Sequence, residues 1–177
     1  YDDADTAGDV EFTWDEASQT EVALIKLVAG KVENKTLSIV DNPVVGTAYK
    51  FGFVSTSQTK GGTYYAVGGM NGYYMSTTTA ASAAIDVYLE ETTGGYYLYT
   101  MEGTAKKYIN MVVSGTHVNG AYEATASTVY TIDETNMTLI AIVNDAEYWF
   151  GTRNDKTYTT MGPCAVSYAG FYCQFYA

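Results

Sequence analysis

The sequence predicts an all-β protein with a β-trefoil-like arrangement, and three observations support this fold class. The 177 residues include 18 tyrosines and many Thr and Val residues, which favour pleated, half-buried strands. Glycine occurs 17 times and proline only twice, a usage that suits many tight turns. A segment of about 42 residues with four strand-like runs recurs three times along most of the chain.

Residues 1–45 are expected to form an acidic linker and an arm of N-terminal strands that pack on the main domain. The first residues, YDDADTAGD, are acidic and contain no apolar run, which is typical of a solvated terminus. Three apolar runs follow at 10–14, 20–30 and 35–40. They favour two or three strands, although the run at 20–30 is long enough for a helix. The turn sequence DNPVVG marks the expected boundary at residue 46.

The predicted domain, residues 46–177, consists of the copies 46–93, 94–135 and 136–177. Expected strands are 48–53, 63–67, 73–78 and 84–90, then 95–101, 106–113, 117–123 and 128–133, and finally 137–143, 146–152, 157–161 and 170–176. One copy cannot bury its own apolar face, whereas three copies around a pseudo-threefold axis can. A β-sandwich is the alternative, because many short, regularly spaced strands also describe one.

The charge of the chain excludes several classes of partner. A formal net charge of −11 disfavours nucleic acid and anionic membrane surfaces, which both select Lys and Arg. No apolar run reaches the ~18 residues of a spanning helix. The chain begins at Tyr1 rather than Met. We expect a monomeric module of a larger secreted or cell-surface protein.

The residues needed for catalysis, cofactors or metals are sparse. His117 is the single histidine, and it lies in a predicted turn. No nucleophile elbow, phosphate-binding loop or dinucleotide fingerprint is present. A glycosidase would need two placed carboxylates, and no pair among the acidic residues is marked out. The prediction is a non-enzymatic protein without cofactor or metal.

Two cysteines, Cys164 and Cys173, stand close together near the end of the chain. Their spacing suits a disulfide that closes a short loop in an extracellular domain. A zinc site would require two further ligands. The alternative to the disulfide is a pair of buried free thiols.

The aromatic run Tyr148-Trp149-Phe150 opens the part of the third copy where the repeat symmetry breaks. Neighbouring strand residues face opposite ways, and the repeat aligns Phe150 with Ile109 and Val67. This alignment predicts that Phe150 is in the core and that Trp149 points away from it as a binding platform. The alternative for Trp149 is a packing role under the loop 164–173.

Aromatic rings combined with short polar side chains are typical of carbohydrate-binding sites. An aromatic ring covers the C–H face of a sugar, and polar side chains bind its hydroxyls, since an unpaired buried polar group costs ~1–3 kcal/mol. Trp14 is a second candidate platform, its alternative being an anchor for the N-terminal arm. The predicted ligand-binding residues are Trp149, Arg153, Asn154, Asp155, Lys156, Tyr158, Tyr168, Tyr172 and Trp14.

The segments GTAYKFG, NGYYMSTT, DVYLEETTGGYYLYTMEGTAKKYINMVVSGTHVN and EYWFGT carry a family resemblance over residues 36–177. This part of the chain resembles a module of the non-catalytic starch-adherence proteins on the surface of starch-degrading gut clostridia, which belong to their amylosome. The resemblance implies binding of starch and α-1,4-linked malto-oligosaccharides, chain ends included. Common versions read YYLGTYGTY where this chain has YWFGTRNDKTY, so no binding residue is transferred from the family. The alternative function is a structural spacer or protein-interaction module.

Overall fold

The computed structural model describes residues 37–155 and 158–177. The chain divides into the units Tyr1–Thr36 and Leu37–Ala177, and every element below belongs to the second. The predicted N-terminal arm up to residue 36 and the candidate residues Trp14 and Lys156 lie outside the described residues.

The second unit begins earlier than the sequence predicts. Ser38 N donates to Ala177 O at 3.0 Å, and Val40 N donates to Phe175 O at 2.9 Å. These bonds tie the segment before the predicted boundary to the last strand of the chain. The boundary at residue 46 is therefore too late, because the DNPVVG turn lies inside the unit rather than at its edge.

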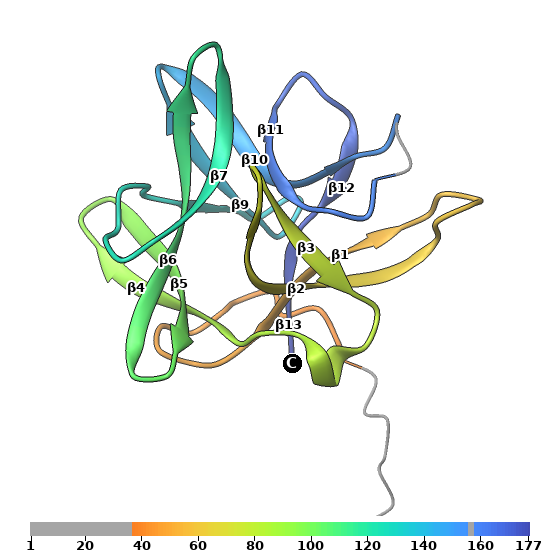
Figure 1. The fold of residues 1–177 in the computed structure, drawn as a ribbon, viewed down its shortest axis with the longest axis horizontal. Coiled ribbons are helices and arrows are strands. Elements are labelled where there is room, and N and C mark those ends of the chain that lie inside the picture. The colour runs from red at the N-terminus through yellow and green to blue at the C-terminus, as the bar shows by residue number, and fades with distance from the viewer. Residues whose placement is uncertain (1–36, 156–157) are drawn as a thin grey trace, which may run out of the picture. The chain divides into compact units, whose positions relative to one another are not determined.

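The prediction of an all-β protein is confirmed (Figure 1). The strands are β1 (Lys50–Ser55), β2 (Gly62–Asn71), β3 (Tyr74–Thr78), β4 (Val87–Thr92), β5 (Gly95–Glu102), β6 (Ala105–Ser114), β7 (His117–Glu123), β8 (Thr131–Asp133), β9 (Thr138–Val143), β10 (Ala146–Arg153), β11 (Gly162–Ala165), β12 (Gly170–Tyr172) and β13 (Gln174–Tyr176). A single short 3-10 helix, η1 (Ala81–Ala83), is the only helix among the described residues.

The strands form three antiparallel sheets with the orders β13-β1-β2-β3, β4-β5-β6-β7 and β11-β10-β9-β8, and β12 pairs with β10. Each sheet joins the last strand of one predicted copy to the first three strands of the next. Short contacts also connect neighbouring sheets: Tyr49 bridges Val87, and Tyr96 bridges Tyr130. All three copies thus contribute in the same way to the strand arrangement.

Local sequence explains the tight hairpins of these sheets. Asn144 and Asp145 join β9 to β10 with φ angles of 52° and 60°. Two successive positive φ values define the turn whose twist matches paired antiparallel strands, and Asn and Asp tolerate this conformation best after glycine. Gly115, with φ of 61°, serves the same purpose between β6 and β7.

The hydrophobic core draws side chains from all three sheets. Phe51 of β1 lies with its ring centroid 5.7 Å from Phe150 of β10 and 5.2 Å from Phe175 of β13. Ile109 is fully buried, as the repeat alignment predicts. In the first copy, however, Ala66 rather than Val67 fills the core position. The alignment is wrong by one residue there, next to a register shift in the β2–β3 pairing.

The third strand of the last copy also lies elsewhere than predicted. The expected strand at 157–161 is replaced by β11, which starts at Gly162. Its register pairs Gly162 with Gly151 and Pro163 with Phe150 of β10. Asn154, Asp155 and residues 158–160 therefore lie outside the strands, between β10 and β11.

A buried amide fixes the loop between β7 and β8. The Asn110 side chain is buried, and its Nδ2 donates to Glu123 Oε2 at 2.7 Å and to Thr125 O at 3.0 Å. Its Oδ1 accepts from the backbone N–H groups of Ser127 and Thr128. One side chain thus bonds Glu123 at the end of β7 and three polar groups of the following segment, which has no strand partner of its own.

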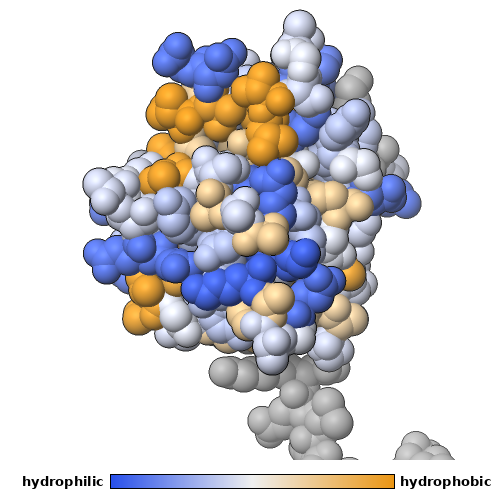
Figure 2. All heavy atoms as spheres, turned by 60° about the vertical axis from the view of Figure 1, so that its left-hand side comes forward, coloured by the Kyte–Doolittle hydropathy of each residue, from blue (hydrophilic) through white to orange (hydrophobic). Residues whose placement is uncertain are grey.

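The surface is mixed, with a concentration of apolar side chains in one area. Figure 2 shows these apolar groups gathered in the upper part of the side that lies at the left in Figure 1. Val113 and Val129 are exposed, and Ile142 is 67% exposed. Exposed apolar side chains that gather in one area are candidates for a surface that contacts another molecule.

Candidate functional site

Trp149 is a packing residue, which corrects the prediction that it forms an exposed platform. Its side chain is 2% exposed. The ring centroid lies 4.7 Å from that of Tyr172 in an edge-on contact. A Cβ atom added to Gly170 would lie 2.2 Å from the indole ring, and one added to Gly151 would lie 2.6 Å from it. The two glycines make the slot in which the indole lies, so no face is left for a sugar.

Strand parity correctly separates Trp149 from Phe150 but does not show what covers the indole. Phe150 belongs to the main core, and Trp149 lies outside it. The indole is covered by β12, which pairs with the C-terminal part of β10. The alternative prediction, packing under the loop 164–173, matches the structure. Tyr172 is the edge-on partner of the indole rather than the wall of an open site.

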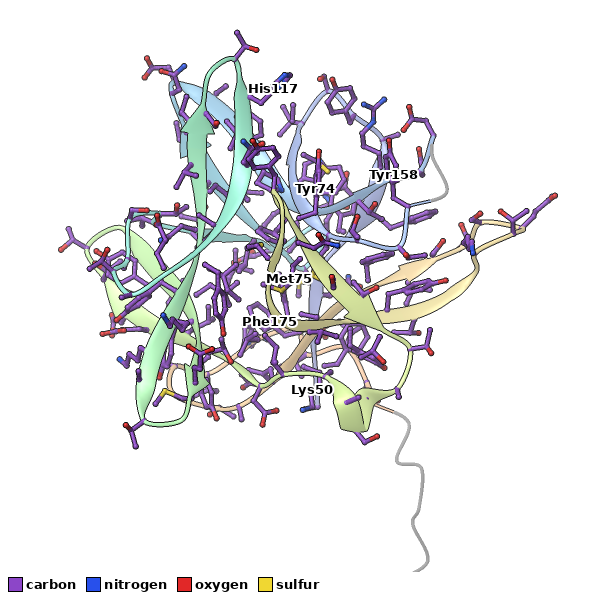
Figure 3. All side chains as sticks on the ribbon, in the orientation of Figure 1. Lys50, Tyr74, Met75, His117, Tyr158 and Phe175 are labelled. Carbon is purple, nitrogen blue, oxygen red and sulfur yellow. The ribbon has the colours of Figure 1, made fainter. Side chains whose placement is uncertain are left out.

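Arg153, Asp155 and Tyr168 contact one another where β10 ends, and Figure 3 labels Tyr158. Arg153 Nε donates to Asp155 Oδ1 at 2.9 Å, and its Nη2 donates to Asp155 Oδ2. The guanidinium carbon lies 4.0 Å from the ring centroid of Tyr168. A two-bond pair combined with stacking fixes the plane of the guanidinium. Arg153, Asp155 and Tyr168 therefore form one unit, called the Arg153 cluster below, together with Tyr158.

Tyr158 supplies the open aromatic surface of the Arg153 cluster. Its side chain is 53% exposed. Hydrogen bonding to Asp155 raises the pKa of Arg153, and the Tyr168 and Tyr158 phenols act in the same direction. Of the two tyrosines, Tyr168 is the one whose ring the guanidinium contacts. Asn154 is exposed, and its backbone N–H donates to Ala169 O at 3.2 Å, which holds the loop to the neighbouring turn.

The predicted disulfide is absent, because Cys164 and Cys173 are buried free thiols. They pair with opposite edges of β10. Cys164 is the register partner of Trp149, whereas the Cys173 N–H donates to Phe150 O at 2.8 Å. The Cys173 sulfur lies 3.7 Å from Met161 Sδ. The alternative prediction of two buried thiols therefore describes this structure.

Both thiols are expected to resist alkylation while the protein is folded. Burial raises the pKa of Cys164 to about 12 and also raises that of Cys173. The thiolate is the reactive form, so iodoacetamide at pH 8 should react more than about a hundredfold slower than in guanidinium. Mass spectrometry measures this rate. Fast labelling of the native protein, or a mass reduced by the hydrogens lost on oxidation, would contradict the structure.

A row of tyrosines crosses the outer face of the sheet β4-β5-β6. Tyr88 and Tyr99 stack with centroids 5.2 Å apart, and Tyr108 lies 5.9 Å from Tyr99. Lys106 lies 4.4 Å over the Tyr99 ring and bonds Glu90 at 2.8 Å. Tyr88 and Tyr99 stack face to face, Tyr108 meets Tyr99 at a tilt, and cross-strand pairs of this kind stabilise sheets. This row is a structural feature rather than an open platform.

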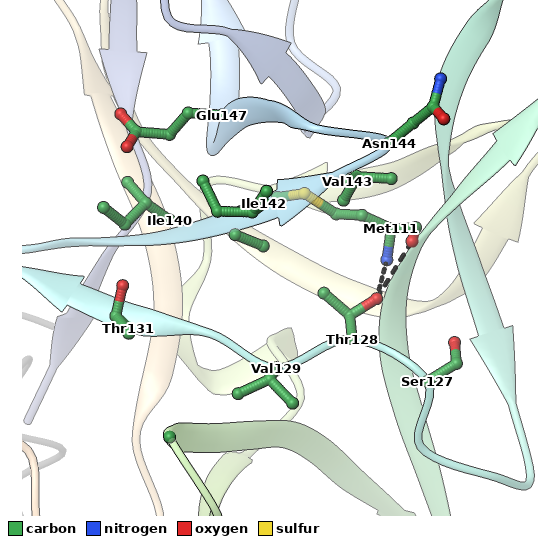
Figure 4. Close-up of a pocket in the computed structure, with 12 residues that line it drawn as sticks. Met111, Ser127, Thr128, Val129, Thr131, Ile140, Ile142, Val143, Asn144 and Glu147 are labelled. Atoms are coloured by element: carbon green, nitrogen blue, oxygen red, sulfur yellow. Dashed lines mark hydrogen bonds between the residues drawn. The ribbon is translucent and has the colours of Figure 1, made fainter.

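A hollow of about 560 Å³ lies between β9 and the loop before β8 (Figure 4). Ile140, Ile142, Val143 and Val129 supply apolar walls, and Glu147 is the one carboxylate in its lining. It contains no aromatic residue. The hollow therefore lacks the flat surface that sugar stacking requires.

The described parts of the chain contain no group of three or more His, Cys, Asp or Glu side chains placed to hold a metal ion. In the same residues, no helix has the length and apolar character needed to span a membrane. Protein-family models, curated protein sequences and solved structures were compared with the chain, and none matches it significantly.

Sequence reasoning overlooked the turn between β2 and β3. Tyr73 and Tyr74 in this turn are both exposed. The sequence feature that indicates this surface is the tyrosine pair in NGYYM, because two tyrosines next to a turn glycine are seldom both buried. The sequence predicted them as strand residues, and only Tyr74 is in β3.

Proposed function

We propose that this chain is a non-catalytic module that binds starch and related α-1,4-linked glucans, malto-oligosaccharides and chain ends included, in a secreted or cell-surface protein. The observation that carries the proposal is the Arg153 cluster. It combines an exposed tyrosine ring with a guanidinium whose orientation is fixed by a carboxylate and a second tyrosine.

The chemistry of the cluster suits a neutral sugar ring. The face of Tyr158 takes the C–H side of a glucose unit, since a rigid aromatic ring gives large contact at low entropy cost. Arg153 carries five N–H donors, of which its bonds to Asp155 engage only some. The others reach for hydroxyl groups, and the Asn154 amide adds a donor and an acceptor. Because Asp155 and Tyr168 hold the guanidinium before the ligand arrives, less ordering of Arg153 is needed on binding.

The choice of α-glucan among sugars rests on two arguments from the sequence. A net charge of −11 disfavours acidic polysaccharides, because like charges repel at close range. The resemblance to starch-adherence modules points to α-1,4-linked glucose. In this proposal the module binds neither nucleic acid nor membrane, and we expect it to act as a monomer.

We also propose that the three sheets build a β-trefoil. Support comes from the sheet orders, in which every sheet takes one closing strand and three opening strands from successive copies. The bridges Tyr49–Val87 and Tyr96–Tyr130 link the first and last strands of the first two copies. In the third copy, Thr138 Oγ1 donates to Cys173 O at 2.6 Å. This threefold recurrence favours a trefoil over a β-sandwich.

Electrophoresis through a gel that contains amylopectin tests the proposed function. The protein should be retarded relative to bovine albumin, and Tyr158→Ala should weaken the affinity at least about fivefold, because a central aromatic contact contributes more than ~1 kcal/mol. Ile142→Ala, which removes an exposed side chain elsewhere, should change nothing. No retardation of the wild-type protein would end the proposal. Release of reducing sugar from soluble starch would contradict its non-catalytic part.

The alternative function, a spacer or protein-interaction module, draws support from the apolar hollow around Ile142. Exposed apolar groups with a polar rim are typical of surfaces that contact other proteins. A folded protein that ignores every glucan on a glycan array would favour this alternative.

A further inference from the structure

A second groove, of about 620 Å³, lies between the β2–β3 turn and the hairpin of β6 and β7. Tyr73 and Met70 line it from the first hairpin, and Val113, Asn119 and Glu123 from the second. Figure 3 labels Tyr74 beside the turn and His117 at the end of the β6–β7 hairpin. The groove thus brings together side chains of the first two copies, whereas the Arg153 cluster belongs to the third.

Backbone contacts hold Tyr73 in place at the edge of the groove. Its carbonyl accepts a hydrogen bond from Gly120 N at 3.0 Å. The next residue, Tyr74, lies so close to Gly162 that an added Cβ there would be 2.7 Å from its ring. The Tyr73 side chain nevertheless remains 57% exposed. A ring that projects from an anchored turn offers a stacking surface with little loss of freedom on binding.

Asn119 gives the groove a polar group that lacks a partner. The residue is 8% exposed and lines the groove. Its amide makes no hydrogen bond to any described residue, in contrast to Asn110, whose amide makes four. The buried partnerless polar atoms of the described residues are Trp149 Nε1 and Tyr176 Oη, so the Asn119 amide still reaches solvent at the groove surface. A ligand hydroxyl, which both donates and accepts, would replace that solvent.

The charge of the groove disfavours an anionic ligand. No lysine or arginine occurs among the described residues that line it, so phosphate or carboxylate ligands have no counter-ion. Glu123 is its one carboxylate, and one of its oxygens already accepts from Asn110 at 2.7 Å. An exposed ring, an unpaired amide and an absence of cations match a neutral hexose unit.

We propose that this groove is a second glucan contact, in which Tyr73 stacks on one sugar ring and the Asn119 amide binds its hydroxyls. The inference rests on the proposed function for its choice of sugar, but it concerns a different site from the Arg153 cluster. Two sites on one module bind a polymer more tightly than either site alone, because the second contact becomes intramolecular. The module therefore binds long glucan chains with higher affinity than short ones.

Calorimetric titration with maltoheptaose separates the two sites. The Tyr158→Ala variant should keep one binding event, and adding Tyr73→Ala should remove it. Asn119→Ala in the Tyr158→Ala background should weaken the residual binding about tenfold. The same substitution should leave the melting temperature unchanged or higher, since no protein partner of the amide is lost. Tyr73→Phe keeps the ring and should keep the binding.

Each other result has a distinct meaning. If Tyr158→Ala alone abolishes all binding, the groove is not a site and the proposed function stands. Residual binding that ignores both Tyr73→Ala and Asn119→Ala overturns the groove in the same way. If only Tyr73→Ala removes binding, the groove is supported and the Arg153 cluster is not the site. A wild-type protein that binds no maltoheptaose overturns both proposals.

Discussion

Trp149→Ala is expected to lower the free energy of unfolding by about 3–5 kcal/mol, the range for removing a large buried aromatic side chain. The indole fills a slot between Gly151, Gly170 and Tyr172. Removing the indole leaves a cavity, and its neighbours Gly151, Gly170 and Tyr172 cannot move far enough to fill it. Urea denaturation followed by circular dichroism measures the change.

Two further variants show whether the slot is the cause. Gly170→Ala should be strongly destabilising as well, because the new Cβ would meet the indole at 2.2 Å. Tyr158→Ala, which truncates an exposed aromatic side chain, should stay within about 0.5 kcal/mol of wild type. A Trp149→Ala protein of near-normal stability that fails to bind glucan would restore the platform role of this residue.

Asn110→Ala is the second substitution with a large expected effect, a loss of at least about 3 kcal/mol. Its amide serves four polar partners, and two of them are backbone N–H groups. These groups lose their only acceptor in a segment that has no ladder to replace it. Asn110→Asp should be at least as damaging, because a carboxylate would face Glu123 and the Thr125 carbonyl.

A matched control for this network is Asn136→Ala. Asn136 Nδ2 makes a single side-chain bond, to the carboxylate of Asp133 at 2.7 Å, so its removal should cost about 1.5 kcal/mol, roughly half the loss at Asn110. Equal stability losses at the two positions would show that the buried network is not what sustains the loop.

The fold could be predicted largely because strand content and hairpin turns are local properties of the sequence. Alternating residues and turn glycines mark nearly every strand, and three copies impose a common order. The errors arise where contacts with residues distant in sequence determine the local structure. Residues 37–40 read as part of the arm but pair with β13, and the bulge in β2 moved Ala66 into the core.

The candidate site was harder to predict for a physical reason. Parity shows on which face a strand residue lies, but it cannot show that β12 crosses over Trp149. The symmetry break after β10 did point to Arg153, Asp155 and Tyr168, which contact one another in the structure, whereas their role in binding stays a prediction. The Tyr73 groove was missed because its walls come from hairpins distant in sequence, joined at Gly120.

The order of the first sheet has a consequence for how the protein is made. β1 pairs with β2 on one edge and with β13 on the other. On a ribosome, the outer edge of β1 stays without its partner until Phe175 has been synthesised. During that interval the emerging chain carries an open strand edge, which is a template for pairing with other chains. Completion of the last strand, rather than any earlier step, ends this period of exposure.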